Sequence, residues 1–569
     1  LSSSRHTTRH SFACCVCILS RSDVTVPTVE KAAARDAVQN RRHSANRTQP
    51  CCLRHKTRHA RVPVSIPRHT VSHSSSLSSS SSSSSASQTM PVSRELRAVL
   101  LLGSAFSLIF FSWNNSKFVA QPILSQAAKD GDIHSQSGYY SLALYYFFRT
   151  SGCLVASTIV EKMTDKIGMI IGAVTYVLLE LGFLYPNQWY ILATSALCGF
   201  GSSVMFSAQG RYLSKWSTPE SAQRNGALIW TMQNGFSVFG GFVLYALQAQ
   251  SSVTSLGQEL TDSEARRRAM NDALAALFSP TLVLWLYSIF VIASLIAIVV
   301  ILSLPPPPCS ESEPSSKKLT ERAPSVCELL ASSFRLMGTR EMLLLAPAFG
   351  YSGIQMAFYG SIYSTSTAFT SRLLEKSSVV VAMVVIATGV GQFSGGFTMT
   401  YLGARVGTTY KRFRLVGVSV AVGVQLIAYL ATWATFPSDS SLHQTSETGP
   451  LSDPIVWVAV VIPLLLGIGD GCLNTQMYAL LAAGPKNEGS RSFSIFRFHM
   501  SLFTSATFFY GTVVSLNWHI PIQCFFAVLA LVCFWVFRSR LPFPLNCTLQ
   551  IVDNDRIRRA ASATVVPKA

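Results

Sequence analysis

The stretch Leu282–Leu304 reads LVLWLYSIFVIASLIAIVVILSL, carries no charged residue and ends at four consecutive prolines, Pro305–Pro308. A helix needs about 20 predominantly apolar residues to cross the hydrocarbon of a bilayer, so this stretch predicts a membrane-spanning helix. It is too long and too continuously apolar for a barrel strand, and only helices and closed barrels satisfy every backbone polar group in lipid. We therefore expect an all-α membrane protein.

Charge-poor apolar stretches of similar length recur on both sides of this one, from Arg97 onward. We expect twelve transmembrane helices, over residues 97–116, 138–160, 167–185, 189–209, 225–247, 280–304, 342–368, 377–400, 414–436, 454–482, 491–516 and 518–537.

The composition of the chain agrees with a membrane protein. Only 13% of the 569 residues are charged, and 49% are hydrophobic, whereas soluble domains carry about 25% charged residues. This balance excludes a disordered polyelectrolyte and disfavours a soluble enzyme. The formal net charge is +19, but residues 1–89 hold 13 Lys and Arg against three acids. The remaining excess is small for 480 mostly apolar residues, so we expect basic membrane edges and no nucleic-acid partner.

Residues 1–89 differ in kind from the rest of the chain. They are rich in Arg, His and Ser, include an unbroken serine run over Ser78–Ser85, and show no apolar periodicity. Such a composition buries too little apolar surface to offset the entropy of ordering, so we predict a disordered leader. It contains no methionine before Met90, and we expect translation to start there. An organelle transit peptide is the alternative interpretation.

The placement of Lys and Arg predicts the orientation. With Met90 in the cytosol, 25 basic residues after residue 89 fall on the cytosolic side, seven on the far side and one, Arg149, inside a span. Lys117, just beyond the first predicted span, counts among the seven. We therefore expect an integral multi-pass protein with both termini in the cytosol. The sequence does not distinguish the plasma membrane from an endolysosomal membrane.

An internal duplication organises the predicted helices. Leu100–Phe106 resembles Leu343–Phe349, and Gly199-Phe200-Gly201 in the fourth span resembles Gly467-Ile468-Gly469 in the tenth. We expect two pseudo-symmetric six-helix halves, 90–304 and 341–537, joined by a cytosolic linker (305–340) and followed by a basic cytosolic tail (538–569). Parallel repeats of this kind are typical of major facilitator transporters, whose central site lies between the halves near the midplane.

A short polar turn between the second and third spans carries the first functional candidates. Asp165-Lys166-Ile167-Gly168 resembles the core of the major facilitator loop signature. An acid at this position lies at a helix amino end and can pair with a nearby Arg. We predict a gating role for Asp165, Lys166 and Gly168, and an ordinary polar turn is the alternative.

Ionisable residues inside a membrane are costly and therefore informative. Arg149 lies in the middle of the second span and Asp470 lies well inside the tenth. Because the two come from different halves and have opposite charge, we expect either a pair or a shared polar cavity. The alternative is structural, with Arg149 reaching the membrane edge or pairing with Glu180 of the third span.

Other polar side chains in the spans complete the set of central-cavity candidates: Gln209, Gln355, Gln392, Asn474, Gln476 and Arg497. Hydrogen bonds between helices are the alternative explanation for the amides, and Arg497 is close enough to a span end to extend to the membrane edge. No nucleotide-binding loop, catalytic triad or metal cluster appears in the sequence. We therefore expect no enzymatic activity, no cofactor and no metal.

Three longer motifs resemble a known family. Phe206–Gly210 (FSAQG), Tyr351–Gln355 (YSGIQ) and Leu465–Gln476 (LLGIGDGCLNTQ) are similar to segments of the Unc-ninety-three-like proteins, a branch of the major facilitator superfamily. The resemblance implies the major facilitator fold for residues 97–537. It leaves two functions open, because members of the family are known as regulatory subunits of potassium channels and as escorts of innate immune receptors.

The first function is transport of a small solute by alternating access. The second is regulation or trafficking of a partner membrane protein, such as an ion channel or receptor, without transport. Gln355 and Gln392 stand where the family pattern leads us to expect acids, and this loss of carboxyls favours the second function. In either case the lipid bilayer is the surrounding partner.

Overall fold

The computed structural model describes residues 92–130, 133–217, 221–250, 278–307, 326–377, 379–406, 411–482 and 489–540. The chain divides into two units, Leu1–Ala86 and Ser87–Ala569, and every described residue belongs to the second. The predicted leader over residues 1–89 lies outside the described residues. So do residues 308–325 of the predicted linker and residues 541–569 of the predicted tail.

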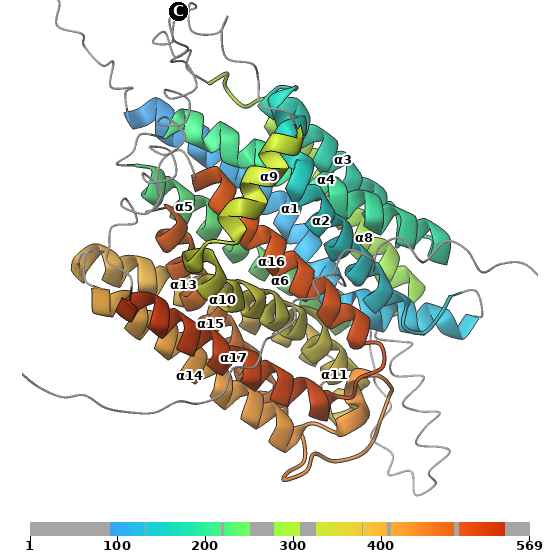
Figure 1. Cartoon of the computed structure of the whole chain (residues 1–569). Helices are drawn as coiled ribbons and strands as arrows, with labels where there is room; N and C mark the ends of the chain where they lie inside the picture. Colours follow the sequence, from blue (N-terminus) through green and yellow to red (C-terminus); the bar gives the residue numbers. More distant parts are fainter. Residues whose placement is uncertain are drawn as a thin grey trace, which may run out of the picture. The chain divides into compact units, whose positions relative to one another are not determined.

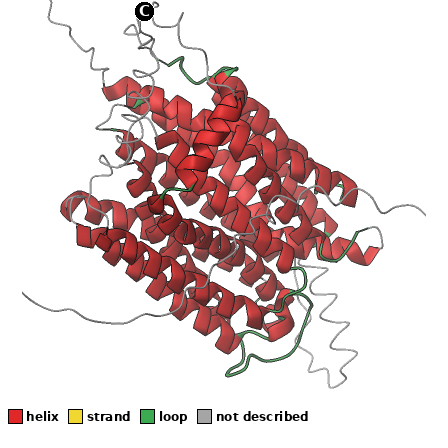
Figure 2. Ribbon diagram, viewed as in Figure 1, coloured by secondary structure: helices red, strands yellow, loops and turns green. Residues whose placement is uncertain are grey.

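The described part of the chain is built from helices (Figures 1 and 2). The first half contains α1 (Val92–Ala127), η1 (Ala128–Asp130), α2 (Ser137–Glu161), α3 (Asp165–Gly182), α4 (Gln188–Trp216), α5 (Ala222–Gly235), α6 (Ser237–Gln250) and α8 (Pro280–Leu302). After α9 (Val326–Met337), the second half contains α10 (Arg340–Ala357), η2 (Phe358–Ile362), α11 (Tyr363–Phe369), α12 (Ser371–Lys376), α13 (Val380–Val406), α14 (Lys411–Thr435), η3 (Ser438–Ser441), α15 (Val456–Ala482), α16 (Gly489–Tyr510) and α17 (Leu516–Arg540).

Eight helical segments among the described residues are long and apolar enough to cross a membrane. They coincide with eight of the twelve predicted spans: α1, α4, α5 with α6, α8, α13, α14, α15 and α17. The other four predicted spans coincide with α2, α3, α10 with α11, and α16. The prediction of an all-α membrane protein is therefore confirmed, and the count of twelve crossings stays a prediction.

Several helices begin at capping residues that the sequence supplies. The side chain of Thr164 accepts a hydrogen bond from the amide of Ile167 at the start of α3. Asn187 accepts one from the amide of Tyr190 at the start of α4, with a length of 3.1 Å. These short polar side chains satisfy amides that have no partner within the helix, and so they fix where each helix begins.

The first helix is longer than predicted. The predicted span ends at Ser116, whereas α1 continues to Ala127. Asn114, Asn115 and Lys117 led us to end the span, but all three are buried against other helices. Polar side chains are unfavourable in a membrane helix where they would face lipid. Here they face other helices, so the helix continues through them.

Two predicted spans are interrupted. The fifth is divided at Phe236, between α5 and α6, where Asn115 of α1 donates a 3.1 Å hydrogen bond to the carbonyl of Ser237. The seventh contains a π-helical turn, η2, between α10 and α11. A side chain bonded into the backbone ladder is a known cause of such breaks, and π-helical turns occur often at functional sites.

The two halves pack internally and against each other. In the first half α2 and α3 pack on α4, and α1 packs on α8; in the second half α13 and α14 pack on α15, and α10 packs on α16 and α17. The halves meet where α2 packs on α16, where α5 and α6 pack on α13, where α5 also meets α15, and where α1 packs on η2 and α11. The cavity described below lies among these contacts.

Glycines bring α13 and α15 into backbone contact. A Cβ atom added to Gly467 would lie 2.9 Å from the amide nitrogen of Gln392 and 3.1 Å from the Cα of Gly391. Gly395 and Gly471 likewise face the backbone of the opposite helix. The spacing of four residues on each helix is the small-xxx-small pattern, which allows this close approach.

The halves are hydrogen-bonded to each other at the end of the bundle where α1 ends and α2 begins. The hydroxyl of Tyr139 donates to the carbonyl of Ser441 at 3.0 Å, and the side-chain Nε2 of Gln136 donates to the carbonyl of Leu442 at 3.3 Å. We call these four residues the loop seal. It links the start of α2 to the loop between α14 and α15.

Candidate functional site

A cavity lies between the two halves, lined by helices from both. It encloses about 800 Å³ of empty space including its open part. Its lining is Phe110, Trp113, Asn114, Lys117 and Phe118 of α1, Tyr146 and Arg149 of α2, Phe206 of α4, Trp230, Gln233 and Asn234 of α5, Met356 of α10, Tyr359 of η2, Gln392 of α13, Asp470, Asn474 and Tyr478 of α15, and Arg497 and Met500 of α16.

Asp470 is held by four uncharged donors. Its Oδ1 accepts from Gln355 at 2.9 Å and from Asn474 at 2.7 Å. Its Oδ2 accepts from Gln392 at 2.9 Å and from the hydroxyl of Tyr359 at 3.2 Å. The side chain is 3% exposed. A carboxylate offers acceptors only, so this set of donors fits the ionised form and occupies both of its oxygens.

The hydrogen-bond network around Asp470 continues to further residues of the second half. Gln355 accepts a hydrogen bond from Gln425 of α14, which in turn accepts from the hydroxyl of Tyr351 at 2.6 Å. Ser352 donates to Asn474 at 2.8 Å. Asp470 is thereby fixed by four helices and η2, and Gln355 acts through it without lining the cavity.

Two arginines from opposite halves meet at one aromatic ring. The guanidinium carbon of Arg149 lies 4.7 Å from the centroid of Phe206, and that of Arg497 lies 4.4 Å from the same centroid. The Nη1 of Arg149 donates to the hydroxyl of Tyr145 at 3.4 Å, whereas its Nε is buried without a hydrogen-bond partner. Cation–π contacts of this kind stabilise arginine but leave most of its donors free.

Lys117 was not among the predicted site residues. It is 3% exposed, and its ammonium lies 5.8 Å from the centroid of Phe118 and 5.7 Å from that of Tyr359. Among the described residues its ammonium has no hydrogen-bond acceptor. Phe118–Leu124 is apolar apart from Gln121, and this apolar run after Lys117 was the signal that the helix continues past it.

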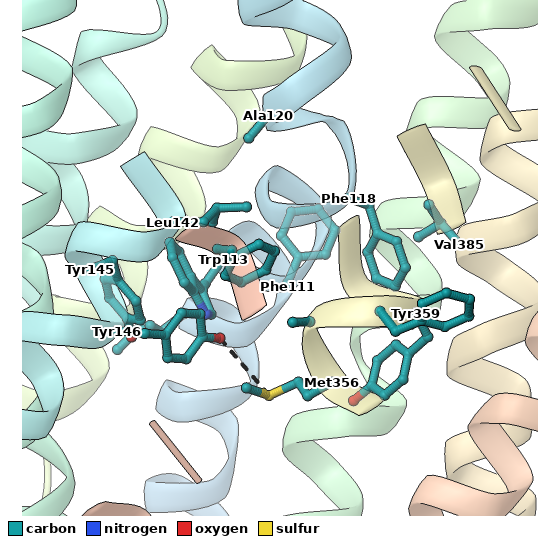
Figure 3. Close-up of a cluster of buried hydrophobic side chains, with 14 of the residues drawn as sticks. Phe111, Trp113, Phe118, Ala120, Leu142, Tyr145, Tyr146, Met356, Tyr359 and Val385 are labelled. Atoms are coloured by element: carbon teal, nitrogen blue, oxygen red, sulfur yellow. Dashed lines mark hydrogen bonds between the residues drawn. The ribbon is translucent and has the colours of Figure 1, made fainter. Parts of the chain in front are cut away.

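Aromatic side chains of α1, α2 and η2 line the cavity, and Trp113, Tyr146 and Tyr359 among them are drawn in Figure 3. The ring of Trp113 lies 4.0 Å from that of Tyr145 and 6.4 Å from that of Tyr146, measured between centroids. The hydroxyl of Tyr146 reaches across to the sulfur of Met356 at 3.9 Å. Both halves therefore contribute to one cavity whose lining combines aromatic rings with amide and charged side chains.

The structure thus brings five of the predicted candidates to the cavity lining: Arg149, Gln392, Asp470, Asn474 and Arg497. Arg149 and Asp470 share the cavity, and among the described residues they form no ion pair. The alternative pair of Arg149 with Glu180 is also not formed, because Glu180 accepts a 3.1 Å hydrogen bond from Ser294 of α8 instead.

Three further candidates are buried away from the lining. Glu180 lies with Ser294 and Ser112, where α1, α3 and α8 meet. Gln209 is buried in α4 and its amide nitrogen has no partner. Gln476 packs towards Gly417 of α14. Whether each side chain faces the cavity or a neighbouring helix depends on the rotation of α3, α4 or α15 about its own axis, which the sequence pattern did not define.

The predicted gating loop forms an ion-pair cluster at the opposite end of the bundle from the loop seal. Asp165 is the first residue of α3, and its carboxylate pairs with Arg211 and, at 2.7 Å, with Lys215, both at the end of α4. Lys166 donates to the carbonyl of Leu302 at 3.2 Å. A Cβ on Gly168 would lie 3.0 Å from Ala208. The loop therefore ties α3 to α4 and α8.

We predict measurable coupling within this cluster. Asp165 is buried while Arg211 and Lys215 are partly exposed, so a double-mutant cycle of Asp165→Asn and Arg211→Gln should give about 1–2 kcal/mol. Unfolding in mixed micelles of detergent and SDS measures it. The control cycle of Asp165→Asn with Lys166→Gln should give less than about 0.5 kcal/mol. Additive effects in the first cycle would contradict the assigned ion pair.

Among the described residues, no group of three or more His, Cys, Asp or Glu is arranged to hold a metal ion. The cavity itself contains a single carboxylate, Asp470, whose oxygens are already occupied. The chemistry available here is recognition of charge and aromatic stacking.

Solved structures define the class of fold. A major facilitator superfamily transporter, FucP, in the outward conformation, matches with a TM-score of 0.50 and 17% identity, covering 79% of this chain and 100% of that chain. A POT family transporter in complex with 5-aminolevulinic acid matches with a TM-score of 0.52 and 10% identity, covering 77% of this chain and 95% of that one. At these identities the likeness shows the fold alone, which is that of the major facilitator transporters.

Sequence comparison then defines the family. The family model described as "Ion channel regulatory protein UNC-93" matches residues 129–535. UNC93-like protein MFSD11 of Xenopus laevis is 24% identical over 456 residues, which is 78% of this chain and 96% of that protein. UNC93-like protein 3 of Arabidopsis thaliana is 24% identical over 435 residues, covering 74% and 81%. The chain belongs to the UNC-93 family, as the resemblance of its motifs implied.

Proposed function

We propose that the protein is a multi-pass transporter that moves a small solute across a membrane by alternating access. In this proposal the cavity lies between two pseudo-symmetric halves, which together have twelve spans, and both termini are in the cytosol. The observation that carries the proposal is that cavity, since its polar side chains come from both halves and the loop seal joins the halves at one end. A central site that is closed at one end is what one state of an alternating-access cycle requires.

The gating loop supports the same proposal. Asp165, Lys166 and Gly168 hold three first-half helices together at the end opposite the loop seal. We propose that this cluster keeps those helix ends rigid while the halves rock against each other. Both solved structures with this fold are transporters by their titles, which also supports a role other than an enzyme's.

Regulation of a partner membrane protein is the second candidate. The description of the matching family model, an ion channel regulatory protein, supports it. The amide at Gln392 supports it as well, because Asp470 is left as the only carboxylate of the cavity lining in the described part of the chain. Gln355, an amide where an acid was expected, donates a hydrogen bond to Asp470 from outside the lining. A regulator of this kind would use the fold as a scaffold and would have no need of alternation.

Cysteine accessibility distinguishes these two functions. In a background without native cysteines, Gln233→Cys places one thiol in the cavity wall. Oriented vesicles are treated with a membrane-impermeant maleimide from either side. A transporter is expected to be labelled from both sides. Cross-linking Tyr139→Cys to Ser441→Cys across the loop seal should abolish labelling from the sealed side and leave the other side unchanged.

The matched control joins two positions within one half at the same end of the bundle. Arg372→Cys and Asp453→Cys replace an exposed ion pair of 3.2 Å, and their cross-link should leave labelling from both sides intact. Labelling of Gln233→Cys from one side only, with or without the cross-link across the seal, would contradict transport and support the regulator.

A further inference from the structure

The charges of the cavity lining do not balance. Lys117, Arg149 and Arg497 contribute three positive charges, and Asp470 contributes one negative charge. Arg149 is 7% exposed and Lys117 is 3% exposed. Buried charges in proteins are ordinarily paired or hydrogen-bonded, because removing them from water is costly. Lys117, Arg149 and Asp470 are buried, so they leave an excess of one cation, and the partly exposed Arg497 adds a second. The lining therefore lacks an anion for at least one buried cation.

Asp470 is the opposite charge that acts on Lys117, but it offsets only one of the three positive charges of the lining. Both of its oxygens already accept two hydrogen bonds each from uncharged donors, namely Gln355, Asn474, Gln392 and Tyr359. Among the described residues it forms no ion pair with Lys117, Arg149 or Arg497. The role of Asp470 is accordingly to fix the second-half wall of the cavity.

The three cations have many hydrogen-bond donors and few acceptors within reach. Arg149 has one long hydrogen bond, to Tyr145, and an unpartnered Nε, and Arg497 and Lys117 make only ring contacts among the described residues. Arg149 and Arg497 lie against the same ring although like charges repel. A bound anion would remove that repulsion, and the forked guanidinium matches a carboxylate or phosphate oxygen pair.

Aromatic rings and amides supply most of the rest of the lining, and the amides are those of Asn114, Gln233, Asn234, Gln392 and Asn474. Phe110, Trp113, Phe118, Tyr146, Trp230 and Tyr359 surround the cations. Rings stack face to edge or offset on other rings, and sites for small molecules combine such walls with a few polar groups that fix orientation. The lining thus fits a solute with one anionic end and one aromatic or apolar end.

We propose that the solute is a small organic anion, with a carboxylate or phosphate held between Arg149 of the first half and Arg497 of the second, and an aromatic body against the rings. Lys117 supplies the third charge from α1. This proposal rests on the proposed function and adds to it the class of substrate. Because the anion contacts both halves at once, its binding draws α2 and α16 together.

Equilibrium binding tests the proposal without any flux. The purified full chain in detergent is screened by thermal shift with two matched series of probes, namely phenylacetate, phenylacetamide and phenethylamine, and indole-3-acetate, indole-3-acetamide and tryptamine. Within each series the shape is conserved while the charge changes from negative to neutral to positive. At least one anion is expected to bind at least about tenfold more tightly than its amide and its amine.

Variants assign the binding to the cavity. Arg149→Gln and Arg497→Gln should each weaken binding of that anion at least about tenfold, and Lys117→Gln should weaken it less because an ammonium lacks the fork. Arg372→Gln, at an exposed ion pair, is the matched control and should leave binding unchanged. Each variant is first shown to be monodisperse, and a variant that fails this is replaced by Arg149→Lys or Arg497→Lys.

Three outcomes would overturn the proposal. They are equal or tighter binding of the amides or amines, no stabilisation by any probe, and stabilisation by 1-palmitoyl lysophosphatidate alone, which would identify a lipid in place of a soluble anion. Anion binding without labelling of Gln233→Cys from both sides would remove transport while leaving the anion site. Labelling of Gln233→Cys from both sides with no preference for anions would support transport and contradict the anion site.

Discussion

Replacing Gly467 with Ile is expected to prevent α13 and α15 from packing, and so to cost more than about 3 kcal/mol. The new Cβ would meet the backbone amide of Gln392 at 2.9 Å and the Cα of Gly391 at 3.1 Å. Backbone atoms cannot move aside as a flexible side chain can, so the two helices must separate. Their separation would also displace Gln392 from Asp470. Size-exclusion yield and the apparent melting temperature measure the loss.

Gly423→Ile in α14 is the matched control. A Cβ at Gly423 meets nothing within 4 Å, and Ile has the higher helix propensity. This variant should give the yield and melting temperature of the parent protein. Equal yield and equal apparent melting temperature of Gly467→Ile and Gly423→Ile would contradict the backbone contact between α13 and α15.

Replacing Asp470 with Ala is the second large effect, with an expected loss of at least about 3 kcal/mol in mixed-micelle unfolding. The change removes the acceptor shared by Gln355, Gln392, Asn474 and Tyr359. Donors that stay buried without an acceptor carry a full desolvation penalty. Asp470→Asn should fall between the parent protein and Asp470→Ala, since the amide keeps one acceptor oxygen but turns two hydrogens towards donors.

Asp453→Ala provides the control for this change. The carboxylate of Asp453 is half exposed and pairs with Arg372 at 3.2 Å, and exposed pairs contribute less than about 1 kcal/mol. A loss at Asp470 no greater than that at Asp453 would show that the four hydrogen bonds do not hold the carboxylate as described.

The sequence was sufficient for the fold because its strongest signal, long apolar runs separated by turns, reports directly on membrane helices. The same signal failed where polar side chains face protein. Lys117 was predicted to lie just beyond the first span, whereas α1 continues through Asn114, Asn115 and Lys117 to Ala127. The break at Phe236 was also missed, because its cause is Asn115 on another helix.

The candidate site was only partly predictable for a related reason. Arg149 and Asp470 stood out because a charge in a span is rare, and both line the cavity. Gln209 and Gln476 stood out equally, yet both are buried elsewhere. Amides in membrane helices serve helix contacts as readily as ligands, and only the rotation of each helix in the folded bundle separates the two uses. Arg211 and Lys215 were not identified as partners of Asp165, because the whole of α3 and most of α4 separate them from it in the sequence.

The position of Lys117 in α1 bears on how the chain is assembled during synthesis. A lysine at the centre of a membrane helix costs about 3 kcal/mol on insertion scales, and Asn114 and Asn115 add to the penalty. The groups that cover this region include Tyr359 and Gly360, which are synthesised more than 200 residues later. A chain truncated before η2 would therefore leave Lys117 without Tyr359 and Gly360, so the second half is needed to cover this cation.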